Sequence, residues 1–478
     1  MKMEKFHAVE FQAKCLIEEN PRLNLLLDKW VEAYNQDTKD YRINATEVFR
    51  KADIIQRYLF SQIEEIHKYA YNASFELILF VKHLENRDDF FFSPSYFFIN
   101  ATFKVMGAWD RLIKFLGVVH DIAFNENQKK NTFDNVYKSL KKNKDFKESK
   151  AFCFINNLKS SGKFKVIDDV RKDNDHNLSR HVKVETDDEL LSDLEDLLEH
   201  CRVLYGFISY CVDLLSNVQK INCKAKFIFD TFSIEKSYDL DGISRGLEVF
   251  MKNNSLPDKI QNISVLIIEQ IQGVLSCNPS SLMEYSAPPL YKIYIFLSDI
   301  VFRLHESIRS IGLTYNLYSE GVHLGYEDLD KYSIYFEGMN YRYFIYSSLF
   351  RVYNVYDKLG HIILDLFEGE KPKHLTFENI IAKNIEEINI PPIQFSKEVI
   401  ESQPYKDLYN NRQEHYHYLV SQEYLSPNVR ELIDFELVRV IIINIEKQIN
   451  IIKMIGKVFF PMVDLVLKIP LNNQNDNL

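Results

Sequence analysis

The chain has 478 residues, of which 46% are hydrophobic and 26% are charged, so it is long enough for two or three domains with separate cores. The small numbers of glycine (14) and proline (13) disfavour a turn-rich all-β fold and favour long helices. A net charge of −10 argues against a protein that coats nucleic acid without sequence preference.

The N-terminal segment and the cysteines predict a cytoplasmic protein. The first twenty residues carry acidic residues through their middle and have no apolar core, unlike a signal peptide. The cysteines form no C-x-x-C pair and no zinc spacing, so we expect buried, reduced thiols. They are Cys15, Cys153, Cys201, Cys211, Cys223 and Cys277.

Apolar residues recur at helical spacing along much of the chain. The clearest segments are Ile54–Leu84, Ser95–Ile122, Leu290–Leu313 and Ser333–Leu366. Between Leu190 and Leu215 they recur at steps of three and four, which places them on one face of a long helix. Thr186 and Glu189 predict a capping box before that helix. No sustained alternation requires a strand, so the predicted fold class is all-α.

The apolar segment Val438–Leu467 raises the question of a membrane span. Six charged residues interrupt it: Arg439, Glu446, Lys447, Lys453, Lys457 and Asp464. Pro461 also lies inside the segment. These residues favour a buried helix pair over a membrane span.

A repeat relates the two halves of the sequence. Phe103–Leu112 (FKVMGAWDRL) matches Phe350–Leu359 (FRVYNVYDKL). Three shorter matches follow in the same order: Thr132-Phe133-Asp134-Asn135 with Thr376-Phe377-Glu378-Asn379, Phe164-Lys165 with Tyr405-Lys406, and Val212-Asp213-Leu214 with Val463-Asp464-Leu465. The constant order and nearly constant spacing predict a duplicated domain.

The repeat and the turn-forming clusters give a predicted domain organisation. Residues 1–50 form an N-terminal helical extension, 51–222 the first copy, 223–285 a helical connector, 286–470 the second copy and 471–478 a polar tail. The matched Trp109-Asp110-Arg111 and Tyr356-Asp357-Lys358 are expected to pack and pair inside each copy. The Tyr-rich run Tyr341–Tyr346 is likewise expected in a core.

An arginine and a histidine recur, with the same spacing, at the equivalent point of each copy. The first copy has Arg171 followed by four residues and His176, and the second has Arg412 followed by four residues and His417. Each Arg stands seven residues after the matched aromatic residue. Histidine titrates near neutral pH, and the arginine fork matches a phosphate group. The sequence contains no Walker-type phosphate loop, dinucleotide-binding fingerprint, serine-hydrolase elbow or H-E-x-x-H zinc motif.

This pattern resembles the HEPN superfamily, helical bundles marked by R-x4-6-H and a following helix. The resemblance implies two HEPN-like domains packed as an intramolecular pseudo-dimer. It also implies a metal-independent endoribonuclease of toxin–antitoxin or anti-phage defence, with one composite site and no cofactor. Many active members have Asn or another small polar residue after the Arg, where this chain has Lys172 and Gln413. A non-catalytic module that binds RNA, a nucleotide or a protein partner therefore stays open as the alternative.

The resemblance also assigns roles to residues. Arg171 and Arg412 would hold the phosphate, while His176 and His417 would act as acid and base, in an order that the sequence leaves open. Neighbouring groups that could support them are Asn174, Asp175, His181, Glu414 and His415. An RNA track would run along Lys159, Lys163, Lys165, Arg180 and Lys406.

The sequence also bears on metal and partners. His415 and His417 have no nearby carboxylate or histidine pair to complete a metal site, so none is predicted. The expected partners are RNA and an antitoxin or other regulatory protein, without a membrane. The chain would be a monomer with an internal pseudo-dimer, or a higher homo-oligomer.

Overall fold

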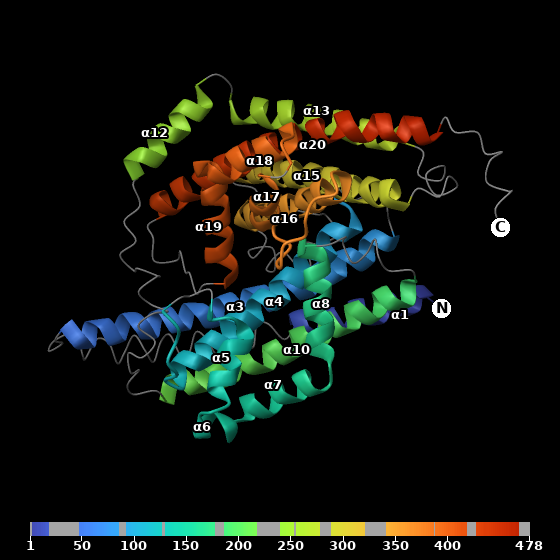
Figure 1. The fold of residues 1–478 in the computed structure, drawn as a ribbon. Helices are drawn as coiled ribbons and strands as arrows, with labels where there is room; N and C mark the ends of the chain where they lie inside the picture. Colours follow the sequence, from blue (N-terminus) through green and yellow to red (C-terminus); the bar gives the residue numbers. More distant parts are fainter. Residues whose placement is uncertain are drawn as a thin grey trace. The chain divides into compact units, whose positions relative to one another are not determined.

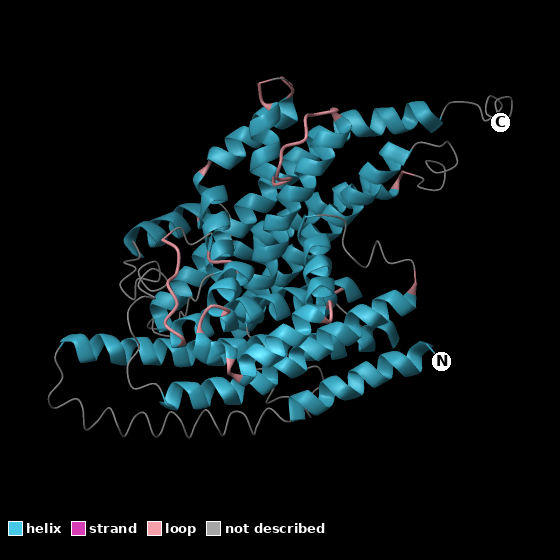
Figure 2. Cartoon of the chain, turned by 60° about the horizontal axis from the view of Figure 1, so that its bottom comes forward, coloured by secondary structure: helices cyan, strands magenta, loops and turns pink. Residues whose placement is uncertain are grey.

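The computed structural model describes residues 2–18, 47–85, 92–126, 130–176, 186–217, 240–252, 255–277, 288–320, 341–386, 388–417 and 427–467. Within these ranges it contains sixteen helices and no strand, which confirms the all-α prediction (Figures 1 and 2). The chain divides into two compact units. Unit 1 comprises Met1–Lys172, Val184–Tyr238 and Gln413–Ser426, and unit 2 comprises Asp173–Lys183, Asp239–Arg412 and Pro427–Leu478.

Unit 1 is built around three long helices. Its helices are α1 (Lys2–Glu18), α3 (Glu47–Glu85), α4 (Pro94–Val119), α5 (Phe133–Leu140), α6 (Lys144–Lys147), α7 (Lys150–Ser160), most of α8 (Lys163–His176) and α10 (Asp187–Asn217). The long helices α3, α4 and α10 pack pairwise, α1 packs on α3 and α10, and α5 packs on α4. The expected apolar face of α10 is confirmed. The apolar residues that form this face between Leu194 and Leu215 are buried, and Leu190 at its start is half-exposed.

Local signals set the starts and ends of the helices in unit 1. Pro94 begins α4 at a position where a missing N–H costs nothing. The Asn143 and Ser149 side chains accept from the N–H groups of Phe146 and Phe152 at the starts of α6 and α7. Between α7 and α8, Gly162 has φ of 80°, a left-handed conformation that suits glycine. At the predicted capping box, the Glu189 N–H donates to the Thr186 hydroxyl at 3.3 Å.

Unit 2 has its own core. Its helices are α12 (Leu240–Met251), α13 (Leu256–Leu275), α15 (Pro288–Glu320), α16 (Tyr341–Leu366), α17 (Phe377–Asn384), α18 (Pro391–Glu401), most of α19 (Gln403–His417) and α20 (Pro427–Leu467). The long helices α15, α16 and α20 pack pairwise, and α12, α13, α17 and α18 pack around them. Helices α12 and α13, from the segment expected to be a connector, therefore belong to unit 2.

The helices that carry the sequence repeat agree in length and order. Both α4 and α16 have 26 residues, α5 and α17 have 8, α7 and α18 have 11, and α8 and α19 have 14 and 15. Two residues after α4 and α16, Asp121 and Glu368 adopt φ of 50° and 51°. Thr132 and Thr376 occupy the N-cap positions of α5 and α17. The matched sequences therefore adopt matched local structures.

Matched aromatic residues also form a similar cluster in each unit. In unit 1, the ring centroids of Trp109 and Phe164 are 5.8 Å apart, and those of Phe133 and Phe164 are 4.5 Å apart. In unit 2, the corresponding rings are Tyr356, Phe377 and Tyr405, with Tyr356 lying 5.1 Å from Phe377 and 4.9 Å from Tyr405. The expectation that these segments pack inside each copy is confirmed, since Trp109 and Tyr356 are both buried.

Charged residues beside these rings are paired inside each unit, as expected. In unit 1, Lys114 pairs with Asp110. In unit 2, the Asp299 carboxylate accepts from Arg303 at 3.2 Å and from Lys358 at 3.1 Å, and all three side chains are buried. A buried ion pair needs such close partners, because the charges have lost their water.

Two expectations need correction. The segment 438–467 is one helix, α20, rather than a helix pair. The exposed Pro461 sits in its last turns beside the exposed Lys457, so water can replace the backbone bond that proline removes. No helix in the described ranges is long and apolar enough to cross a membrane. Among the cysteines, Cys153 is exposed and Cys15 is half-buried rather than buried, and Cys223 lies outside the described residues.

Candidate functional site

The two R-x4-H motifs lie at the C-terminal ends of matched helices. Arg171 is in α8 and Arg412 in α19, and the helices end at His176 and His417. Positions five residues apart on an ideal α-helix lie roughly 140° apart around its axis, so a regular helix does not bring an R-x4-H pair to one atom. The side chains of Asp175, His176, Glu414 and His417 lie outside the described part of the chain, as do Arg180 and His181.

Arg171 is held by an acidic neighbour on its own helix. Its Nε and Nη2 donate to Asp168 Oδ1 at 3.3 and 2.9 Å. The Lys172 ammonium also lies 2.5 Å from Asp168 Oδ2. Burial would raise the pKa of Asp168, but the charges of Arg171 and Lys172 outweigh burial and lower that pKa. Asp168 is thus a carboxylate that holds Arg171 in a defined orientation.

Arg412 has a different environment from Arg171. It is buried, and its guanidinium carbon lies 4.6 Å from the ring centroid of Tyr353. Tyr353 is itself buried, and its hydroxyl lies 3.4 Å from Glu378, which also accepts from the Tyr405 hydroxyl at 2.6 Å. The second-motif arginine is therefore packed on an aromatic face.

A cavity of about 520 Å³ opens beside Arg171 and is lined entirely by residues of unit 1. One part of the lining is aromatic, from Trp109, Phe133 and Phe164. The other part is charged or polar, from Asp110, Thr132, Asp134, Lys159, Lys165, Asp168, Arg171 and Lys172, and Met106 completes it. Cavities of this size commonly hold small molecules or parts of larger ligands.

The expected RNA-track lysines differ in their surroundings. Lys159 pairs with Asp134 at 2.6 Å, and its ammonium lies 5.0 Å from the Phe133 ring centroid. Lys163 is half-buried, and its carbonyl lies 3.3 Å from His200 Nε2. Lys165 and Lys406 are exposed at matched positions of α8 and α19. Lys159 and Lys165 line the cavity, so two of these lysines are brought together with Arg171.

Two expected supporting residues are buried. Asn174 is buried in α8, and His415 is buried in α19. The His415 carbonyl accepts from Arg111 at 3.0 Å. Arg111 also donates to Gln62 at 2.9 Å. The His415 carbonyl also accepts from the Tyr69 hydroxyl at 3.4 Å.

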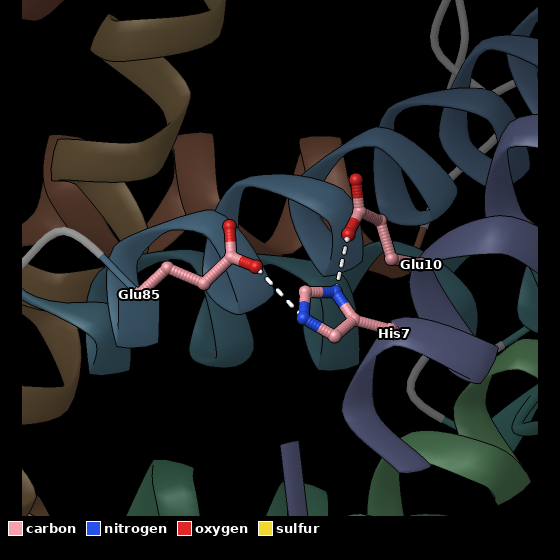
Figure 3. A group of neighbouring side chains, drawn as sticks. All are labelled: His7, Glu10 and Glu85. Carbon is pink, nitrogen blue, oxygen red and sulfur yellow. Dashed lines mark hydrogen bonds and ion pairs between the residues drawn. The ribbon is translucent and has the colours of Figure 1, made fainter. Parts of the chain in front are cut away.

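One cluster in the described residues has the composition of a metal site but the contacts of an ion-pair network. His7 of α1 lies between two carboxylates, with Nδ1 3.2 Å from Glu10 and Nε2 2.9 Å from Glu85 (Figure 3). The carboxylates thus contact opposite nitrogens of one ring. Lys14 and Lys82 also pair with Glu10 and already neutralise its charge. This cluster fits a link between α1 and α3 better than a cation site.

Sequence reasoning did not identify the cavity residues Met106 and Asp168 as candidates. Asp168 carries a weak signal, because an acid three residues before Arg171 on a helix faces it. Met106 carries none, since methionine at helical spacing is typical of a core.

Comparison with known proteins identifies part of the chain. Residues 296–468 match the family model of the HEPN_Cthe2314-like HEPN domain. The match runs from within α15 to just past α20 and includes the motif of Arg412 and His417. No curated protein and no solved structure matches the chain.

Proposed function

Because the chain carries a HEPN domain at residues 296–468, as the resemblance of its motifs predicted, we propose that it is a metal-independent endoribonuclease. Both R-x4-H motifs would contribute to one active site. The protein would be a toxin or an anti-phage defence effector controlled by an antitoxin or another regulatory protein. The observation that carries the proposal is the presence of an Arg and a His at matched positions of two matched helices, one of them inside the HEPN domain.

The repeat of sequence and helix length supports a site with two motifs. Matched segments have equal or nearly equal helix lengths and place matched aromatic residues in similar clusters. We infer that the segment around α4, α8 and α10 descends from the same ancestor as the HEPN domain. A second copy within the chain would supply the second Arg and His that a single helix cannot direct to the same atom.

The proposed reaction uses the nucleophile of RNA itself. One motif histidine removes the proton from a 2′-hydroxyl, whose oxygen attacks the adjacent phosphorus. The bond from phosphorus to the 5′ oxygen breaks, and the other histidine donates a proton to that oxygen. The products are a 2′,3′-cyclic phosphate and a 5′-hydroxyl. Arg171 and Arg412 would stabilise the extra negative charge of the phosphorane.

A specific observation favours the alternative of a non-catalytic binding module. Arg412 is buried against Tyr353, whereas an arginine that binds phosphate must present its fork to the ligand. Lys172 and Gln413 also replace the small polar residue that many active members carry. In this alternative the chain would bind RNA, a nucleotide or a protein without cutting it.

Cleavage of a mixed RNA substrate in EDTA tests the proposal. The wild type should cut RNA and leave 2′,3′-cyclic phosphate ends, while His176→Ala/His417→Ala should not. The exposed His374 lies outside both motifs, so His374→Ala is a matched control that should cut like the wild type. RNA binding without cleavage by the wild type would favour the binding module. Equal cleavage by the wild type and the double variant would remove the motif histidines from the mechanism.

A further inference from the structure

We propose that the cavity beside Arg171 binds one unpaired nucleobase of the RNA, next to the phosphate that Arg171 contacts. The inference rests on the proposed RNA substrate, but it concerns recognition rather than cleavage. It predicts that the protein binds an unpaired base of any sequence on one side of the cleaved bond.

The size and the aromatic wall of the cavity fit a base. Its volume of about 520 Å³ exceeds what a single base needs and leaves room for part of the ribose. Phe133 and Phe164 are stacked with an interplanar angle of 24°, and Trp109 meets Phe164 edge to face at 70°. Flat aromatic surfaces of this kind bind unpaired bases of any sequence by stacking.

The charged side of the cavity fits the phosphate attached to that base. Lys159, Lys165, Arg171 and Lys172 all line it. Their described acidic partners, Asp134, Asp168 and Asp169, are themselves partly exposed, with side chains 66%, 27% and 55% accessible. Partly exposed ion pairs contribute little, so a phosphate group can replace a carboxylate at small cost. The cations would then hold the backbone while the rings hold the base.

Unit 2 carries larger or apolar side chains at the matched positions. Tyr353 replaces Met106, Tyr409 replaces Asp168, and Ile400 replaces Lys159. The Tyr353 and Tyr409 ring centroids lie 5.9 Å apart, and Arg412 lies over Tyr353. These side chains occupy the place of a base and of one cation. In the described residues, unit 2 would therefore contribute a similar motif without a base pocket matched to this cavity.

The pocket can be tested by fluorescence without any cleavage. The chain has two tryptophans, Trp30 and Trp109, so Trp30→Phe leaves the cavity residue Trp109 as the only reporter. The probe is a short 2′-O-methyl oligonucleotide, which has no 2′-hydroxyl nucleophile. Its abasic counterpart has the same backbone and charge. We expect the base-containing oligonucleotide to quench Trp109 and to bind about ten-fold more tightly than the abasic one.

A filling variant gives an independent test. Met106→Tyr introduces the side chain that unit 2 has at the matched position, Tyr353. It should weaken binding of the base-containing probe about ten-fold, whereas Met106→Leu, which conserves the side-chain volume, should not. Circular dichroism checks that both variants fold. The comparison of the base-containing and abasic probes requires neither variant. Equal binding and equal quenching by the two probes would overturn the proposal. Base-dependent binding without RNA cleavage would support the pocket and refute only the nuclease.

Discussion

Protonation of His200 should destabilise unit 1 in mild acid. His200 of α10 is fully buried, its Nδ1 accepts from Trp109 Nε1 at 2.9 Å, and its Nε2 lies 3.3 Å from the Lys163 carbonyl. The neutral ring with its proton on Nε2 satisfies both partners. Adding a proton to Nδ1 breaks the Trp109 bond and places a charge beside the rings that line the cavity.

The size of the loss in unfolding free energy follows from the pKa of His200. Burial lowers this pKa from 6.5 to about 4, against the raising effect of the Lys163 carbonyl. Between these values the unfolded chain binds more protons than the native state, so the free energy of unfolding falls as pH falls from 6.5 towards 4. The total loss is about 3 kcal/mol. His67, whose pKa burial also lowers to about 4, adds a loss of the same sign in the same window.

Urea unfolding between about pH 7.5 and about pH 4.5, followed by Trp109 fluorescence in the Trp30→Phe background, measures the effect. His200→Asn retains an acceptor near Trp109 and cannot titrate. Its absolute stability will be lower, because it leaves part of the ring volume empty. The informative quantity is the change with pH, which should be about 2–3 kcal/mol smaller in the variant. An identical pH dependence in both proteins would refute the argument that His200 is buried and neutral.

Three further substitutions test the packing of the two units by urea unfolding. Asp299→Asn removes the carboxylate that accepts from both Lys358 and Arg303 and should cost about 3–5 kcal/mol, so a loss under about 1 kcal/mol would contradict this network. Tyr356→Phe removes the hydroxyl that donates to Asn444 Oδ1 at 2.8 Å and should cost about 1–2 kcal/mol, whereas no change would mean that Asn444 finds another donor. Gly162→Ala should cost about 1 kcal/mol because of its φ of 80°, and a stabilising effect would contradict that conformation.

Periodicity predicted much of the helical architecture. The buried face of α10 was predictable from apolar residues at steps of three and four. The helix pair expected within residues 438–467 was wrong, because proline near an exposed helix end breaks no buried bond. Residues 333–340 of one predicted helix lie outside the described residues.

The candidate site was predictable only in part. The motif positions on α8 and α19 follow from the repeat, since matched sequences give matched helices. The cavity does not, because side chains of α4, α5, α7 and α8 line it together. Such a space has no periodic signature. The burial of Arg412 likewise depends on three-dimensional neighbours.

RNA cleavage by the single variants His176→Ala and His417→Ala, measured beside the double variant in EDTA, tests the central claim most directly. If both motifs contribute to one site, each single variant should lose activity as completely as the double variant, because acid and base act in one reaction. If each single variant kept about half of the wild-type activity, the motifs would be separate sites, and the claim of one shared site would be contradicted.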